Sequence, residues 1–277
     1  MNRLRTPQRV AVVKALVEGN SIRSTVRLTG VAKNTVVKLL VELGAAVAEY
    51  QDKTLRNLPS KRVQCDEIWS FCYAKKKNVT PEIRKKNPAA GDVWTWTAID
   101  SDSKLIVSFY VGSRDTTSAM EFLRDTAGRL TNRVQLTTDG HKPYLSAVDY
   151  AFGTEIDYAT LVKLYGKDPA EDEKRYSPAV CIGCERTVVS GDPDPDHIST
   201  SHVERQNLSM RMSMRRFTRL TNAFSRKLEN HMAAVALYFM WYNFGRVHQT
   251  LRVTPAMEAG VTDHVWSVEE IVALLEK

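Results

Sequence analysis

The chain has 277 residues, 43% of them hydrophobic, and a formal net charge of +7. This length and apolar content allow a large buried core, so we expect one large domain joined to a smaller one. The sequence has no run of roughly 18–20 uncharged apolar residues that would span a bilayer, and its N-terminus lacks the apolar segment of a signal peptide. We therefore expect a cytoplasmic protein with no membrane partner.

The positive charge is concentrated in two segments. Residues 1–62 contain twelve Lys or Arg against four Asp or Glu, and residues 205–227 contain seven basic residues and no acidic one. Clustered basic residues bind polyanions by releasing the counterions condensed on phosphates. The distribution favours a nucleic-acid partner, although charged runs on helices are also typical of solvated surfaces.

Residues 6–52 have helical patterning and predict three helices. The second begins at Ser21 and ends at Gly30, and a longer helix follows. A short helix, a glycine turn and a longer helix are the order of a helix-turn-helix, so residues 1–60 are predicted to be a DNA-binding domain. A three-helix bundle with a solvated surface is the alternative interpretation.

The helix-turn-helix interpretation assigns DNA contacts to the start of the third predicted helix. A recognition helix presents the hydrogen-bonding groups of its first turns to base edges in the major groove. The DNA-contacting residues predicted there are Lys33, Asn34, Thr35 and Lys38.

Residues 61–262 change to a pattern of strands and helices. The predicted strands are 62–77, 92–100, 104–112 and 133–140. The first three are joined by short connections and predict an antiparallel meander, and a helix over residues 115–130 carries the chain to a fourth strand parallel to the first. This order predicts an α/β domain with a ribonuclease H-like mixed sheet and flanking helices. A C-terminal helix is expected over residues 263–277.

Acidic residues lie on three of the predicted elements. Asp66 is in the first strand, Asp139 ends the fourth strand, and Glu204 lies in the first turn of a later helix. The first and fourth strands are neighbours in the predicted sheet, and two close carboxylates repel each other unless a cation lies between them. Because Asp66 and Glu67 face opposite sides of an extended strand, only one of them is expected to join Asp139, and we select Asp66.

Asp139 also has a simpler interpretation, because a lone Asp-Gly after a strand is usually a turn. Three carboxylates on three elements instead suit one or two Mg²⁺ ions, with Mn²⁺ as a substitute, for in-line phosphoryl transfer. The metal-site interpretation therefore depends on the three residues together.

Several motifs resemble a known family. The stretches CDEIWSF, TTDGHKPY and HVERQNLSMRMSMRRF resemble the three catalytic segments of DDE transposases of the insertion-sequence-one family. The stretch YNFGRVHQTLRVTPAMEAG resembles an ending shared by many insertion-sequence transposases and integrases. The resemblance spans roughly residues 60–262 and implies that Asp66, Asp139 and Glu204 are the catalytic, metal-binding triad.

The resemblance also implies an activity and partners. Such an enzyme binds the terminal inverted repeats of its own element and a target DNA, as a homodimer or higher oligomer. It nicks the element ends by hydrolysis, and the freed 3′-hydroxyl then attacks the target. The resemblance places Arg246 and His248 near DNA, although a packing role for His248 is equally open.

The basic segment after Glu204 is predicted to contact DNA through Arg205, Arg211, Arg215 and Arg219. The helix predicted after Glu204 places positions 211, 215, 219 and 226 on one face at helical spacing, whereas 205 and 216 diverge from it. Arg211, Arg215 and Arg219 are therefore expected to contact phosphates close to the metal site.

Between Asp139 and Glu204 lie 64 residues, which leave room for a further strand and for an insert over about 166–200. The acidic, proline-rich composition of the insert predicts an exposed, mobile loop. Cys181 and Cys184 in this insert have the spacing of zinc ligands.

A structural zinc needs four ligands, so binding of zinc would require further residues such as His197 or His202, and the question stays open. The four cysteines of the chain are too few for a disulfide framework and are expected to be free thiols. His231, on an otherwise apolar helix, is expected to be buried and hydrogen-bonded rather than a ligand.

Two alternative functions use the same predicted domains. One is a transcription regulator with a non-catalytic α/β domain, and the other is a ribonuclease H-like nuclease without strand transfer. The three carboxylates and the basic segment argue against a regulator, because a ligand sensor has no need for them.

Overall fold

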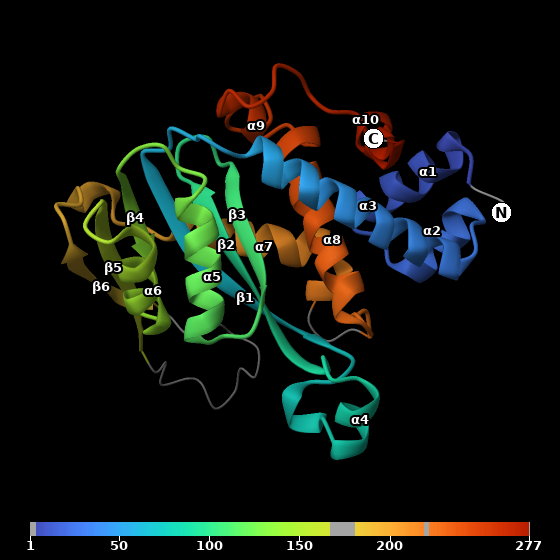
Figure 1. Cartoon of the computed structure of the whole chain (residues 1–277), viewed down its shortest axis with the longest axis horizontal. Helices are drawn as coiled ribbons and strands as arrows, with labels where there is room; N and C mark the ends of the chain where they lie inside the picture. Colours follow the sequence, from blue (N-terminus) through green and yellow to red (C-terminus); the bar gives the residue numbers. More distant parts are fainter. Residues whose placement is uncertain (1–3, 167–180, 219–221, 277) are drawn as a thin grey trace.

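The computed structural model describes residues 4–166, 181–218 and 222–276. It is a mixed α/β structure with one six-stranded sheet, helices on both faces of the sheet, and a group of N-terminal helices beside it (Figure 1). In the order of the sheet the strands are β3 (Ile106–Gly112), β2 (Gly91–Asp100), β1 (Arg62–Cys72), β4 (Val134–Thr138), β5 (Ile156–Tyr165) and β6 (Cys181–Ser190). The expected mixed sheet with flanking and preceding helices is confirmed.

Strand β1 lies in the middle of this sheet. β1, β2 and β3 form an antiparallel meander, β4 runs parallel to β1, β5 runs parallel to β4, and β6 returns antiparallel to β5. Helix α5 (Thr116–Ala127) connects β3 to β4 and so allows the parallel pairing that the sequence predicted.

Helices cover both sides of the central strands. Along β1 the apolar Val63, Cys65 and Ile68 are almost inaccessible, and the polar Gln64 and Ser70 are buried as well. Near-continuous burial of this kind is typical of a strand covered on both faces. Strand β6, at the edge of the sheet, is instead exposed along nearly its whole length.

The remaining helices surround the sheet. They are α4 (Pro81–Lys86), α6 (Pro143–Phe152), α7 (Ser201–Ser213), α8 (Leu228–Met240), α9 (Pro255–Glu258) and α10 (Val268–Ala273). Short 3-10 helices occupy Lys76–Asn78, Pro195–His197, Arg215–Phe217 and Leu274–Glu276, and a π-helical turn, Trp241–Gly245, extends α8. Side chains cap several helix starts: Asp115 accepts the N–H of Ser118 at 2.9 Å at the start of α5.

The N-terminal segment forms the three predicted helices, α1 (Thr6–Val17), α2 (Ile22–Thr29) and α3 (Lys33–Thr54). Ser21 caps α2 by accepting the N–H of Ser24 at 3.1 Å. Gly30 ends α2 with a φ of 70°, a left-handed conformation that favours glycine. The sequence signals for the start and the end of α2 therefore correspond to real caps.

Helix α3 packs along α8 (Figure 1). Gly44 permits their close approach, because a Cβ at this position would lie 2.4 Å from the Cβ of Ala233. Leu40 and Leu43 of α3 belong to the same hydrophobic core as Phe239 of α8. The N-terminal helices and the sheet layers thus share one continuous core.

Two expectations for the second half of the chain are wrong. Residues 181–190 of the insert form strand β6 rather than a mobile loop, because they pair antiparallel with β5; residues 167–180 lie outside the described residues. The helix after Glu204 ends at Ser213, because Met214 is buried in an extended conformation and the next turn buries Phe217. None of the described helices is long and apolar enough to cross a membrane.

Candidate functional site

Parallel pairing of β1 and β4 brings two acidic residues together. Cys65 pairs with Thr138, so the residues that follow them, Asp66 and Asp139, lie at the same level of the sheet. Oxygens of the two carboxylates lie within 4.8 Å of each other. Asp139 also accepts the backbone N–H of His141 at 3.0 Å. It therefore caps the turn after β4 and takes part in an acidic cluster at the same time.

Glu204 enters the same pocket from helix α7. The side-chain oxygen of Gln64 in β1 accepts the N–H groups of His202 and Val203, at 2.8 and 3.2 Å, and so joins the first turn of α7 to the sheet. Asp66, Asp139 and Glu204 line one open pocket of about 600 Å³. One oxygen of Glu204 accepts the Thr200 hydroxyl at 2.8 Å, and the other pairs with Lys163.

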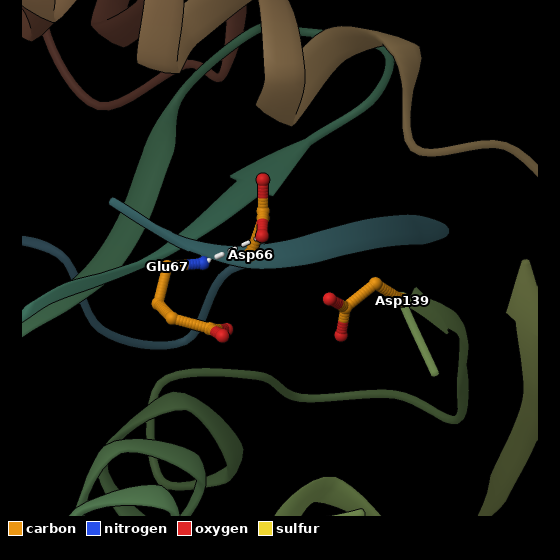
Figure 2. Close-up of side chains that lie close together, drawn as sticks. All are labelled: Asp66, Glu67 and Asp139. Carbon is orange, nitrogen blue, oxygen red and sulfur yellow. Dashed lines mark hydrogen bonds between the residues drawn. The ribbon is translucent and has the colours of Figure 1, made fainter. Parts of the chain in front are cut away.

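Glu67 lies close to this site, which corrects the expectation that only one of Asp66 and Glu67 can join Asp139. The two side chains do leave β1 in opposite directions (Figure 2). Asp66, Glu67 and Asp139 nevertheless each bring an oxygen to within 4.8 Å of the other two. Alternation along the strand predicted the directions correctly but not the distances, because Asp139 on the neighbouring strand lies within reach of both side chains.

The buried carboxyl of Glu67 has two partners. Its side chain is 0% exposed, one oxygen accepts Arg114 Nε at 2.6 Å, and the other accepts the hydroxyl of Tyr144 at 3.0 Å. Burial, reinforced by the charges of Asp139 and Asp66, raises the pKa of Glu67 to about 7 even though Arg114 opposes the shift. Glu67 thus both adds to the acidic cluster and holds an arginine beside it.

Asp66 is also a perturbed acid. Burial, together with the charges of Asp139 and Glu204, raises its pKa to about 6, although hydrogen bonds from the N–H of Glu67 and from Asn207 oppose the shift. The N–H of Glu67 donates to Asp66 at 2.8 Å (Figure 2). A carboxyl group whose pKa is raised by neighbouring acids is stabilised in its ionised form by a bound cation.

Asn207 gives an independent observation that the site fits a metal ion. Its amide nitrogen donates to Asp66 at 2.8 Å. Its amide oxygen is buried and has no hydrogen-bond partner among the described residues, although buried polar atoms are normally paired. Carboxylate and amide oxygens are the donors that Mg²⁺ and Mn²⁺ prefer. The residues that could hold such an ion are Asp66 and Asp139, with the Glu67 carboxylate within 4.8 Å of both and Asn207 beside Asp66. Glu204 lines the same pocket, but it is paired with Lys163 and does not belong to the close group of three.

Two basic side chains in the pocket were missed by sequence reasoning. Arg114, just after β3, is held by Glu67 and lies over the ring of Trp94 at 4.7 Å. Lys163, in β5, pairs with Glu204. Both line the pocket with the carboxylates. The only sequence signal was a basic residue at the end of one strand and another within an apolar strand, which does not point to a site by itself.

The predicted recognition residues lie at the start of α3, which begins at Lys33. Lys33, Asn34 and Lys38 are exposed, and Thr35 is half-buried. Lys38 lies 3.6 Å from Glu42, an exposed pair that contributes little to stability. Three of the four side chains are therefore accessible to solvent, and their contact with DNA stays a prediction.

The predicted arginine face after Glu204 does not exist as one helical stripe. Arg205 is exposed on α7 and Arg211 is half-buried near its end. Arg215 is exposed in the 3-10 turn beyond the helix, so it does not follow Arg211 at helical spacing. Arg219 lies outside the described residues. Arg216 is instead turned inward, with Ser225 as a hydrogen-bond partner at 2.5 Å.

Arg246 and His248 follow α8 in a loop, as the sequence predicted. Arg246 is exposed, and the ring of His248 contacts the hydroxyl of Thr250 at 3.0 Å. Partial burial lowers the pKa of His248, and the charges of Lys104 and Arg246 lower it further. His248 is thus a neutral group at neutral pH within a basic neighbourhood.

The other candidate ligands do not form a metal site in the part of the chain that the structure describes. Cys181 and Cys184 are exposed on β6, and neither belongs to a described group of three metal-binding side chains. His197 lies 3.7 Å from Asp194, and His202 contacts Lys104 at 3.1 Å.

His231 is fully buried, with its two ring nitrogens each 3.2 Å from a serine hydroxyl, on Ser70 and Ser225. Burial lowers its pKa to about 3. The expectation of a buried, hydrogen-bonded histidine is confirmed.

Comparison with protein-family models and with curated protein sequences finds no match for this chain. Its function is therefore argued from the geometry of the site and from the sequence motifs.

Proposed function

We propose that the chain is a DDE-type DNA transposase that resembles the insertion-sequence-one family and has a ribonuclease H-like catalytic sheet. The observation that carries the proposal is the meeting of Asp66, Asp139 and Glu204, from three separate elements, in one open pocket. The central position of β1, with β4 parallel beside it, supports the ribonuclease H-like assignment. The substrates would be the terminal inverted repeats of the element and a target DNA.

The chemistry would be phosphoryl transfer on DNA. Mg²⁺ or Mn²⁺ held by Asp66, Asp139 and Glu204 would supply activation of the attacking oxygen and stabilisation of the leaving oxygen. The protein's own contribution is to fix these carboxylates. Asn207 orients Asp66, the N–H of His141 orients Asp139, and the Thr200 hydroxyl orients Glu204.

Arg114 and Lys163 give the pocket cations that suit a DNA phosphate. Guanidinium and ammonium groups donate charge-assisted hydrogen bonds to phosphate oxygens. Arg114 is fixed from two sides, by Glu67 and by the ring of Trp94. In this proposal Arg114 binds the DNA phosphate that lies next to the carboxylates, and Glu67 positions Arg114.

Glu67→Gln tests this assignment. The substitution keeps the shape of the side chain and one oxygen that can accept Arg114 Nε, while the Tyr144 hydroxyl would have to accept from the amide NH2 instead of donating. It removes the charge that anchors Arg114. Hydrogen bonds to charged groups are stronger by about 1 kcal/mol, so we expect DNA cleavage to fall roughly fivefold to tenfold. Glu121→Gln, which removes an exposed acid paired with Arg124 on α5, is the control. Unchanged cleavage would mean that Arg114 does not act through Glu67, and complete loss would make Glu67 a metal ligand.

The N-terminal helices would read the terminal repeats. For Lys33→Gln we expect weaker binding to every duplex and a salt slope reduced by about one unit, as for a phosphate contact, whereas Asn34→Ala should lose preference at one base pair. The measurement is fluorescence anisotropy with the full chain, because a fragment of α1–α3 would expose the face that packs on α8. Lys53→Gln, an exposed change at the far end of α3, is the control. Equal effects of Lys33→Gln and Lys53→Gln would place the recognition surface elsewhere.

The proposed activity is tested by incubating the purified chain with Mg²⁺ or Mn²⁺ and DNA that carries both flanks of its gene. We expect nicks at the ends and then joining of the freed 3′ ends to a plasmid. Nicks without joined products would favour the nuclease alternative. Binding without nicks under any divalent cation would favour the regulator.

A further inference from the structure

The connection between β1 and β2 projects from the body of the protein. This segment, residues 73–90, is called the basic finger below, and Figure 1 shows it extending away from the sheet with α4 at its far end. Every residue from 73 to 89 is described by the structure, and none of them is buried. The finger therefore adds nothing to the core, and its role has to come from its exposed surface.

That surface carries a dense positive charge. Six exposed basic residues stand against one acidic residue, Glu82. The six are Lys75, Lys76, Lys77, Arg84, Lys85 and Lys86. None of the six forms an ion pair with any residue that the structure describes. Uncompensated charge of one sign on a projecting segment is the electrostatic signature of a polyanion-binding surface.

Local contacts hold the finger in shape without burial. The hydroxyl of Thr80 caps α4 by accepting the N–H of Ile83 at 3.3 Å, and Asp92 accepts the N–H of Lys76 at 2.9 Å. The side chain of Asn87 donates to the backbone carbonyl of Arg226 at 3.0 Å, which ties the finger to the segment before α8. The basic residues are thus presented on an ordered support, which lowers the entropic cost of binding.

The finger lies in line with the carboxylate pocket. It leaves the sheet at Cys72, six residues beyond Asp66 in the same strand, which at about 3.3 Å per residue is roughly 20 Å. Successive phosphates on one DNA strand advance by about 3.4 Å along the helix axis. A duplex that ran along β1 with one phosphate at the pocket would therefore reach the base of the finger about six base pairs away.

We propose that the basic finger binds the phosphate backbone of double-stranded DNA. The expected distance of about six base pairs between the finger contacts and the reacting phosphate rests on the proposed function, whereas the binding of DNA by the finger does not. A duplex fits the surface better than an anionic membrane does, because the aliphatic Val79 and Ile83 are half-buried and the exposed Tyr73 lies at the base of the finger, next to Cys72.

The binding test uses the full chain, EDTA and a random 30-base-pair duplex, so that no cleavage is required. The finger variant combines Lys76→Gln, Lys77→Gln and Lys85→Gln. The control variant combines Lys14→Gln, Lys53→Gln and Arg124→Gln, which removes the same charge from exposed positions elsewhere. Since each phosphate contact contributes about 0.9 to the salt slope, we expect the finger variant to lose nearly three units of slope and, in 0.1 M salt, roughly 100-fold in affinity. The control should keep the wild-type slope.

Three outcomes would overturn the proposal: a finger variant with the wild-type slope, an equal loss in both variants, or a loss confined to duplex RNA or phosphatidylserine vesicles. Circular dichroism of both variants establishes that they are folded. Hydroxyl-radical footprinting on an end-containing duplex tests the expected distance, and protection about six base pairs from the cleaved bond should disappear in the finger variant. Normal finger binding together with no cleavage by the wild-type chain would reject the proposed function and leave the finger proposal standing.

Discussion

Asp139→Asn is expected to abolish DNA cleavage while the protein stays folded and still binds DNA. The substitution keeps the size of the side chain and an oxygen that can accept the N–H of His141, so the turn after β4 should survive. It removes one of the charges that would hold the divalent cation, and loss of that cation affects the attacking and the leaving oxygen together. Cleavage and strand transfer should therefore fall by several orders of magnitude in a gel assay with end-containing DNA.

Asp66→Asn and Glu204→Gln should have the same effect, and a double variant should cost little more than either change alone, because the side chains act as one unit. Asp149→Asn, an exposed change on α6, is the matched control and should keep full activity. Thermal melting of each variant excludes unfolding. Near-normal cleavage by folded Asp139→Asn would leave Asp139 only its role as a turn cap.

The acidic cluster should make the stability of the metal-free protein fall as the pH rises. Asp66 and Glu67 have pKa values of about 6 and 7 in the folded chain, against ordinary values of 3.8 and 4.5. The folded state therefore binds more protons than the unfolded state between roughly pH 4 and 7. The stability contributed by these protons is present at low pH and is lost as the pH rises through the folded pKa values.

Mg²⁺ should reverse this loss, because it binds the ionised carboxylates of the folded state. In scanning calorimetry with EDTA, we expect the melting temperature of the wild type, relative to that of an Asp66→Asn, Glu67→Gln double variant, to fall by about 5 °C or more between pH 5 and pH 8, since 1 kcal/mol corresponds to about 2–4 °C for a chain of this size class. The comparison cancels the opposite contribution of the buried His231, whose lowered pKa is common to both proteins.

Added Mg²⁺ should stabilise the protein more at pH 8 than at pH 5. The double variant should lose this effect of Mg²⁺. A melting-temperature difference between the wild type and the double variant that does not change between pH 5 and pH 8 would contradict the pKa shifts of Asp66 and Glu67.

Much of the fold could be predicted from local patterns. Strand-like segments with short connections gave the meander, and the helix before β4 gave the parallel pairing with β1. This pairing is what places Asp66 beside Asp139, so the most important distance in the site followed from topology. Ser21 and Gly30 likewise predicted the limits of α2, because caps are local signals.

The features that could not be predicted depend on contacts between distant segments. Helix α7 ends at Ser213 because Met214 and Phe217 are buried against the rest of the protein, while the local sequence is compatible with a longer helix. Strand β6 is exposed along nearly its whole length, and only its pairing with β5 defines it.

The arrangement of the site also depends on contacts between distant segments, which the sequence alone could not predict. Alternation along β1 separates Glu67 from Asp66, but it does not reveal that Asp139 lies within reach of both. Arg114 belongs to the pocket through its pairing with Glu67, which is 47 positions away in the chain. Neither residue type nor spacing carries information of this kind, because the pair forms only when β1 and the end of β3 are in place.

The most direct test of the account is to map the protein segments that surround a bound metal. Fe²⁺ would replace Mg²⁺ in the full-length chain, and ascorbate with peroxide would generate radicals that cut the backbone close to the ion. We expect three cuts, near Asp66, Asp139 and Glu204, all suppressed by excess Mg²⁺ and absent from Asp139→Asn. Cuts that omit the Glu204 segment, or that persist in Asp139→Asn, would contradict the claim that these three residues form one metal centre.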